Sequence, residues 1–413
     1  MDRLTNTVRP YAWGSPTAIP ALLGTPPTGE PQAELWMGAH PGAPSTLDRG
    51  DGPRSLDSVI AADPEGELGA PAVRHFGPTL PFLLKLLAAG EPLSLQVHPD
   101  LEQARSGFAD EEARGVPLDA PERTYKDANH KPELICALDD FTGLCGFRAP
   151  ADTALLLGSL DVPALAPLVE ILLGKPEPEA LREALTAVLT DPALTAADTV
   201  EAVTEALEGA AADITGSGLP AALSDSLGSY AAVGRIFPGD PGVIAALLLN
   251  FVRLEPGEAL YLGAGVPHAY LSGLGVEILA NSDNVVRCGL TPKHVDVPEL
   301  LRIVDFRSAD PGVLHPVPVP GSDGEEVYPT PIDEFRLSRY TLGGTAPDTR
   351  RIAGGAPQIL LCTEGTAVLT DADDSSVTLR RGESAYVSAG TADLRVTAAD
   401  SAPSTVFRAT VSL

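Results

Sequence analysis

The stretch Leu93–Asp100, "LSLQVHPD", has the pattern of a short β-strand with two unlike faces. Because side chains alternate along a strand, Ser94, Gln96 and His98 lie on one face, and a leucine and a valine lie on the other. A solvent-exposed edge would favour Lys, Glu or Thr. A Gln and a His two residues apart, soon after the apolar run "LPFLLKLL", instead predict a polar pocket within a β-rich fold.

Around this stretch the chain divides into regions of different sequence pattern. Residues 1–149 and 232–322 carry short apolar runs between turn signals, which predicts one mainly β domain built from two segments. Residues 150–231 repeat Ala, Leu and Glu at helical spacing, which predicts a helical insert domain. Residues 323–413 contain short strands between turns, typical of an antiparallel sandwich or jelly roll. The expected fold is mainly β with a helical insert.

Two segments of the chain resemble each other. The sequence "LEPGEALYLGAG", residues 254–265, is echoed by "RRGESAYVSAG", residues 380–390. Such self-similarity indicates a duplicated β unit. A histidine follows the first copy at position 268, but none follows the second. We therefore expect the second copy to be structural.

The charge of the chain limits its partners. The formal net charge of −28 over 413 residues argues against nucleic acid and anionic membranes. Any anionic substrate then needs a local cationic site. The chain has only five lysines, and all but Lys175 flank the polar motifs: Lys85, Lys126, Lys131, Lys175 and Lys293. This clustering, unless it arises by chance, predicts a pocket for phosphate or carboxylate.

Further features bear on location and assembly. The four cysteines show no CxxC spacing, and the opening residues "MDRLTNTVRPYAW" lack the apolar segment of a secretory signal. No apolar run reaches transmembrane length. These features predict a cytoplasmic protein with free thiols. The strong negative charge also favours a monomer.

His98, Glu133 and His268 offer two imidazoles and a carboxylate, a ligand set of catalytic zinc sites that leaves one position open. Gln96 can add a carbonyl oxygen. The same ligands would also suit a non-haem iron oxygenase. No local signature such as HExxH is present, and the other interpretation of His98 is a core histidine that is hydrogen-bonded to the backbone.

Two further residues suggest proton transfer and anion binding. Glu277 lies in "GVEILA", where apolar neighbours can raise its pKa and suit it to proton transfer. Arg287 lies in "NVVRCGL" and requires an anionic partner or substrate. A structural salt bridge between Glu277 and Arg287 would satisfy the same pattern.

Six longer motifs carry a family resemblance: "YAWGS", "AELWMGAHPGAPS", "PFLLKLLAAGEPLSLQVHPD", "YKDANHKPELICAL", "FTGLCGFR" and "PHAYLSGLGVEILANSDNVVRCGLTPKHVD". In their order, from residue 11 to about residue 300, they resemble type I mannose-6-phosphate isomerases. The resemblance implies a cupin-like jelly-roll β-barrel, a second C-terminal β-barrel or sandwich, and one zinc ion per chain.

The resemblance also implies roles for individual residues. The ligand pattern of the family falls on Gln96, His98, Glu133 and His268, and its active-site arginine falls on Arg287. Its pocket includes residues that match Ser94, Lys131, Glu277 and Lys293. Of these, Ser94, Lys131 and Lys293 are the expected contacts to the phosphate or to sugar hydroxyl groups.

The expected activity is reversible isomerisation of D-mannose 6-phosphate and D-fructose 6-phosphate through a cis-enediol. Glu277 is the first candidate to carry the proton between C2 and C1, while Lys131, His130, Asp283 and zinc-bound water stay open. The alternatives are another cupin metalloenzyme, of the iron oxygenase type, and a non-catalytic sugar-phosphate sensor. Oxygen dependence would identify the first, and loss of ligands or of Arg287 would indicate the second.

Overall fold

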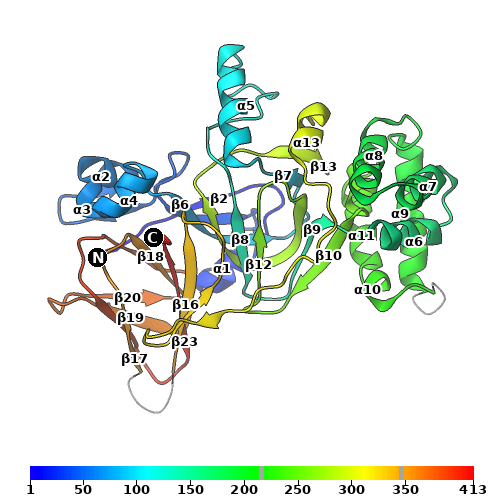
Figure 1. The fold of residues 1–413 in the computed structure, drawn as a ribbon. Helices are drawn as coiled ribbons and strands as arrows, with labels where there is room; N and C mark the ends of the chain where they lie inside the picture. Colours follow the sequence, from blue (N-terminus) through cyan, green and yellow to red (C-terminus); the bar gives the residue numbers. More distant parts are fainter. Residues whose placement is uncertain (214–217, 344–347) are drawn as a thin grey trace.

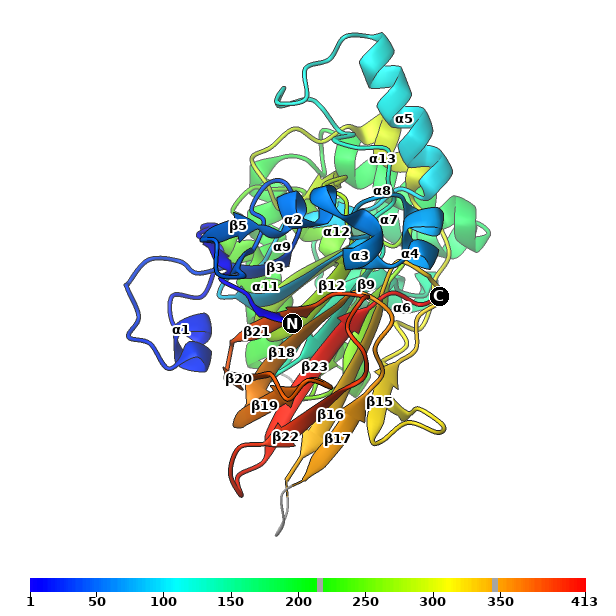
Figure 2. The same cartoon turned by 90° about the vertical axis from the view of Figure 1, so that its left-hand side faces the viewer.

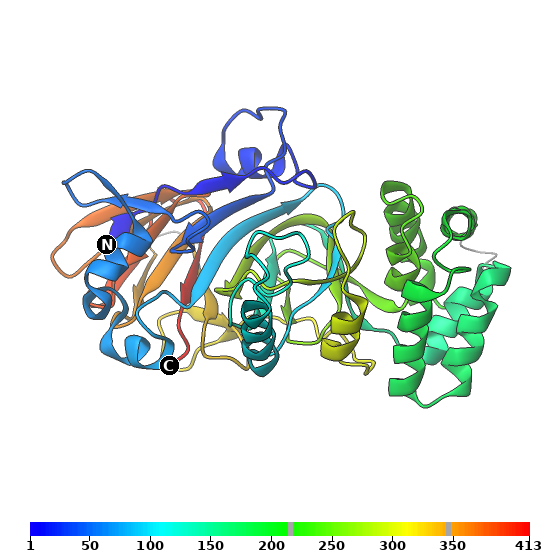
Figure 3. The same cartoon turned by 90° about the horizontal axis from the view of Figure 1, so that it is seen from above.

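The structure is a computed structural model that describes residues 1–213, 218–343 and 348–413. The molecule is elongated, with a bundle of helices at one end and packed β-sheets over the remainder (Figures 1 and 3). Both termini lie toward the end opposite the helices (Figure 3). The fold is mainly β with a helical portion, as predicted.

The central β unit is organised around one long strand, β12. Its strands are β2 (Thr7–Arg9), β3 (Glu34–Gly38), β6 (Phe82–Ala89), β7 (Leu95–Val97), β8 (Glu133–Ala137), β9 (Phe141–Phe147), β10 (Leu249–Leu254), β11 (Ala259–Leu262), β12 (His268–Ala280) and β13 (Val286–Gly289). The first part of β12 pairs with β7 and β9, and the second part pairs with β6 and β8. Because β12 belongs to both ladders, it joins the two sheets that flank the site.

Strand β6 shows why the apolar run is continuous. Leu84 and Leu86 on one face pack in a core shared with C-terminal strands, and Leu87 on the other face packs between the two central sheets. A strand covered on both faces needs apolar side chains at nearly every position. Lys85 shares the face of Leu87 and is buried there, so its charge requires partners.

The helical unit consists of α6 (Pro150–Ser159), the 3₁₀ helix η1 (Pro163–Leu165), α7 (Ala166–Gly174), α8 (Glu177–Thr190), α9 (Ala197–Ala212), α10 (Ala221–Ser224), α11 (Leu227–Ile236) and α12 (Gly242–Ala246). In α8 the buried residues Leu181, Leu185 and Val188 recur at helical spacing and face the core of the bundle. The predicted boundary at residue 231 falls inside α11, and strand structure resumes only at Leu249. The division into domains stays a prediction.

The C-terminal strands form two sheets that pack on each other (Figure 2). One has the order β1 (Asp2–Arg3), β21 (Ser384–Val387), β18 (Gln358–Glu364), β23 (Ser404–Thr410), β16 (Arg336–Leu342), β15 (Glu325–Tyr328) and β14 (Val317–Pro318). The other has the order β17 (Thr349–Ile352), β22 (Leu394–Ala398), β19 (Thr366–Thr370) and β20 (Ser376–Arg380). The first strand of the chain thus pairs with the C-terminal sheet, although residues 1–149 are grouped with the central unit in the sequence prediction.

The sequence repeat has a structural counterpart in two turns. Before β11, the Glu258 carboxylate accepts a hydrogen bond from the backbone N–H of Glu255 at 2.8 Å. Before β21, the Glu383 carboxylate accepts one from the backbone N–H of Arg380, also at 2.8 Å. Each glutamate therefore closes the turn that leads into a buried strand.

The remaining elements are α1 (Ala18–Leu23), β4 (Thr46–Asp48), β5 (Pro53–Ser55), α2 (Leu56–Ala62), α3 (Pro64–Leu68), α4 (Ala70–Phe76), α5 (Leu101–Ala113) and α13 (Val297–Ile303). The ladders of the described strands close no barrel, so the central unit consists of open, packed sheets where a closed jelly-roll barrel was expected, while the C-terminal strands form the predicted sandwich. In the parts of the chain that the structure describes, no helix is both long enough and apolar enough to span a membrane.

Candidate active site

Three buried side chains from separate segments meet at the centre of the β unit. His98 follows β7, Glu133 begins β8 and His268 begins β12, and one ligand atom from each lies within 4.8 Å of the others. The two Glu133 carboxylate oxygens lie 3.4 Å from His98 Nε2 and 3.5 Å from His268 Nε2. Strand pairing explains part of this arrangement, because His268 lies opposite Gln96 across the β12–β7 ladder.

Backbone carbonyls orient both imidazoles. His98 Nδ1 lies 2.7 Å from the carbonyl oxygen of Asn284, and His268 Nδ1 lies 2.9 Å from that of Val266. A carbonyl can only accept, so each Nδ1 carries the proton and each Nε2 presents a lone pair. Burial lowers the pKa of His98 to about 4, despite the attraction of Glu133, and this keeps the ring neutral.

Glu133 is ionised although it is buried. Burial by itself would raise its pKa, but the charge of Lys131, with Nζ 3.0 Å from the carboxylate, holds the pKa well below its ordinary value. Among the described residues, His98 Nε2 and Glu133 Oε2 have no hydrogen-bond partner. Buried polar atoms are rarely left unpaired, and a cation between them would satisfy both. Two neutral imidazoles and a carboxylate therefore fit a zinc ion.

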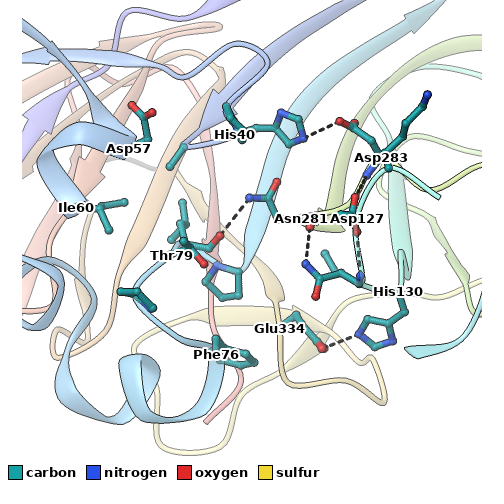
Figure 4. A pocket seen from close by; sticks show the side chains of 18 of the residues that line it. His40, Asp57, Ile60, Phe76, Thr79, Asp127, His130, Asn281, Asp283 and Glu334 are labelled. Carbon is teal, nitrogen blue, oxygen red and sulfur yellow. Dashed lines mark hydrogen bonds and ion pairs between the residues drawn. The ribbon is translucent and has the colours of Figure 1, made fainter. Parts of the chain in front are cut away.

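A cavity of about 630 Å³ adjoins these residues and contains most of the predicted site. The predicted residues in its lining are Ser94, Gln96, Lys131, Glu133, Glu277, Arg287 and Lys293. The two remaining candidates for proton transfer, His130 and Asp283, line a separate cavity of about 590 Å³, in which His130 contacts Glu334 and Asp283 contacts His40 (Figure 4).

The larger cavity contains two further buried residues, Lys85, which the sequence placed only in the general cluster of lysines, and Glu34, to which it gave no role. Lys85 Nζ lies 3.2 Å from Glu277 Oε2 and 3.5 Å from Glu34 Oε2. Burial disfavours the charge of Lys85, but the surrounding carboxylates outweigh this effect and raise the pKa of the lysine above its ordinary value. The sequence contains one sign of this pair: a single lysine lies inside the apolar run of β6, and such a buried charge needs carboxylate partners.

Glu277 pairs with Lys85, so the alternative salt bridge to Arg287 is not formed. Burial raises the pKa of Glu277 to about 6, while the attraction of Lys85 works in the opposite direction. A carboxylate with this pKa can gain and lose a proton near neutral pH.

Arg287 and Lys293 are the cationic side of the same cavity. Among residues 1–213, 218–343 and 348–413, no carboxylate lies within ion-pair distance of either side chain. Burial lowers the pKa of Arg287, and burial together with the charge of Arg287 lowers that of Lys293. Two unpaired cations in a protein of net charge −28 indicate a site for an anion such as phosphate.

The helical unit supports the loop between these two cations. Asp240 accepts hydrogen bonds from the backbone N–H groups of Thr291, at 2.9 Å, and Gly242, at 2.7 Å. Leu290 adopts a left-handed backbone with φ 56°, which costs energy in a non-glycine residue. Gly242 packs so closely on this loop that a Cβ atom there would lie 2.4 Å from the Leu290 nitrogen. The helices therefore hold the loop in a strained conformation.

Comparisons with known proteins agree with this geometry. Residues 1–150 match the family model "Phosphomannose isomerase type I, catalytic domain". Mannose-6-phosphate isomerase of Salmonella typhimurium is 40% identical over 94% of this chain and 95% of its own length, and that of Escherichia coli is 39% identical over 96% and 97%. The human enzyme is 30% identical over 94% and 93%.

Solved structures extend the similarity to the whole fold. A crystal structure of a mutant phosphomannose isomerase from Salmonella typhimurium superimposes with a TM-score of 0.88 at 36% identity, covering 100% of both chains. A zinc-bound mannose 6-phosphate isomerase superimposes with a TM-score of 0.87 at 36% identity, covering 100% of this chain and 99% of the other.

Proposed function

The chain belongs to the type I phosphomannose isomerase family, and on that premise we propose that it interconverts D-mannose 6-phosphate and D-fructose 6-phosphate. The observation that carries this proposal is that one cavity brings together a buried metal-binding cluster and two cations that have no carboxylate partner among the described residues. The metal-binding cluster can organise the sugar oxygens. The two cations can bind the phosphate of the substrate and stabilise the negative charge that develops during the reaction.

His98, Glu133 and His268 are the proposed zinc ligands. Gln96 is the proposed fourth: its amide nitrogen lies 3.4 Å from His268 Nε2, and turning the amide by 180° would direct its carbonyl oxygen toward the cluster. Zinc, when bound, supplies a Lewis acid that polarises oxygens of the open-chain sugar.

The substrate is held by the polar wall of the cavity. Lys293 and Ser94 are proposed to contact the phosphate or sugar hydroxyl groups, and Lys131 extends this wall toward Glu133. Arg287 is proposed to stabilise the negative charge that develops on the enediol oxygens, since its guanidinium has fixed donors and no carboxylate in the described part of the chain competes for them.

Glu277 is proposed to carry the proton. Its carboxylate takes the proton from C2 and returns it to C1, and the reverse reaction uses the same group. Lys85 holds the carboxylate in place and limits the rise of its pKa, so that most of Glu277 is ionised at neutral pH.

The test is conversion of mannose 6-phosphate by purified protein, before chelation, after chelation and after zinc is added back. Fructose 6-phosphate formation that stops with chelator and returns with zinc is the expected result. Turnover that persists in protein shown by metal analysis to be metal-free would contradict a catalytic zinc. A fully metallated protein that leaves both sugar phosphates unchanged would contradict the isomerase.

A further inference from the structure

We propose that Asp127 and Asn284 form a positioning clamp, which fixes the imidazole of His98 for metal binding. This inference rests on the metal site of the proposed function and extends it to two residues outside the substrate cavity. The clamp joins the loop 126–129, which leads to Lys131 and Glu133, to the loop 281–284, which leads to Arg287.

Asn284 uses its backbone and its side chain for different tasks. Its carbonyl oxygen accepts the Nδ1 proton of His98 at 2.7 Å. Its side chain is buried: Oδ1 accepts from the backbone N–H of Lys126 at 2.7 Å, and Nδ2 donates to the carbonyl oxygens of Asp127 and Asn129, each at 2.8 Å. The amide therefore sets where the carbonyl that holds His98 lies.

Asp127 holds the same loop from the other side. Its Oδ2 accepts the backbone N–H of Asp283 at 2.8 Å, and its Oδ1 accepts the hydroxyl of Ser282 and the backbone N–H of Asn129, each at 2.9 Å. Figure 4 shows Asp127 facing Asp283 at the edge of the second cavity. The carboxylate thus accepts hydrogen bonds from both loops and fixes the position of one loop relative to the other.

The consequence reaches the metal site through one hydrogen bond. Because the Asn284 carbonyl can only accept, it keeps the proton of His98 on Nδ1 and directs Nε2 toward Glu133, 3.4 Å away. Displacing the carbonyl would free the ring to rotate or to change tautomer. Neither Asp127 nor Asn284 lines the larger cavity, so both act on the metal through His98 and have no direct contact with the site of the substrate.

The experiment compares zinc affinity in three proteins: wild type, Asp127→Asn and the matched control Asp139→Asn. Asp139 also accepts a backbone N–H between segments, that of Leu274 at 2.7 Å, but contacts no metal ligand. Zinc dissociation constants are measured on the metal-free full-length proteins by competition with a chromophoric chelator, and the Tm of each metal-free protein is recorded in parallel.

Loss of a direct partner of a ligating histidine typically weakens metal binding about 10- to 100-fold. Because Asp127 acts on His98 through the Asn284 carbonyl, we expect Asp127→Asn to weaken zinc binding about tenfold, at the lower end of that range, and Asp139→Asn to leave it within about twofold. Asn284→Asp should match Asp127→Asn. Should both variants fail to fold, Ser282→Ala removes only the hydroxyl that donates to Asp127 and accepts the backbone N–H of Asn284, and it should weaken zinc binding about two- to tenfold.

Zinc affinity equal to wild type in Asp127→Asn, with a lower Tm of the metal-free protein, would overturn the clamp and leave these residues a purely structural role. The proposed metal site would stand in that case. A wild-type protein that binds no zinc would overturn the metal site and the clamp together.

Discussion

Replacement of Lys85 by Met most directly tests how the site sets the pKa of Glu277, its proposed proton carrier. The lysine is buried with its ammonium group 3.2 Å from Glu277 and 3.5 Å from Glu34. Met retains much of the length and apolar surface of the side chain but removes its charge. Burial and the charges of Glu133 and Glu34 would then act on Glu277 with little opposition, and its pKa would rise above about 6.

The separation of the two groups gives the size of the effect. Two unit charges 3.2 Å apart interact by about 5 kcal/mol at an effective dielectric constant of about 20. One pH unit corresponds to about 1.4 kcal/mol, so even a quarter of this energy would raise the pKa of Glu277 by about one unit. A carboxylate must be ionised to take a proton. Turnover therefore falls about tenfold for each unit by which the pH of the solution lies below the pKa of Glu277.

The assay is the pH dependence of kcat for the zinc-loaded enzyme, with Glu34→Gln as the matched control. The Glu34 charge raises the pKa of Glu277, so its removal should shift the acid limb of the profile to lower pH. Lys85→Met should shift that limb to higher pH and recover activity in alkaline buffer. Trp36, which donates to the Glu34 carboxylate at 2.5 Å, can still donate to the amide oxygen of Gln.

Opposite shifts in the two variants would support Glu277 as the proton carrier. An acid limb that stays in place in both variants would show that another group carries the proton. Shifts in the same direction would refute the electrostatic account. Circular dichroism and chemical denaturation must accompany the kinetics, because removing one partner of a buried ion pair costs about 3–5 kcal/mol.

Four further substitutions separate the remaining roles. His98→Ala and His268→Ala should each lose zinc and activity together, as measured by metal analysis and turnover, and retention of one equivalent of zinc in either would contradict the ligand assignment. Arg287→Ala should keep its zinc but lower kcat about 100-fold, which is typical for one donor to a developing anion; a fully active variant would exclude that role. Lys293→Ala should raise KM about tenfold and leave kcat nearly unchanged, as measured by steady-state kinetics. A lower kcat with an unchanged KM would place Lys293 in the chemical step.

Local pattern was enough to predict several features of the site. The alternation of "LSLQVHPD" places Gln96 and His98 on the same side of the chain, and the structure brings Gln96 opposite His268. Alternation also places Lys131 and Glu133 on the same side of the chain, and Lys131 Nζ lies 3.0 Å from Glu133 Oε1. The shared face of each pair depends on neighbours two residues apart and follows from strand geometry alone, whereas the pairing of Gln96 with His268 joins distant segments.

Long-range packing decided the rest. Sequence alone left Glu277 with Arg287 as an alternative partner, but pairing of β12 with β6 sets Glu277 opposite Lys85. His130 lies only one residue from Lys131 yet faces another cavity, because adjacent side chains on an extended chain point apart.

The sequence by itself therefore determined the mainly β fold, the helical portion and the chemical types gathered at the site, since each follows from local periodicity or from a long family motif. Only the tertiary structure decided that β1 joins the C-terminal sheet, that the ladders stay open and that the Asn284 carbonyl holds His98. These contacts join segments far apart in the chain, and their partners depend on which sheets pack together, which no local pattern specifies.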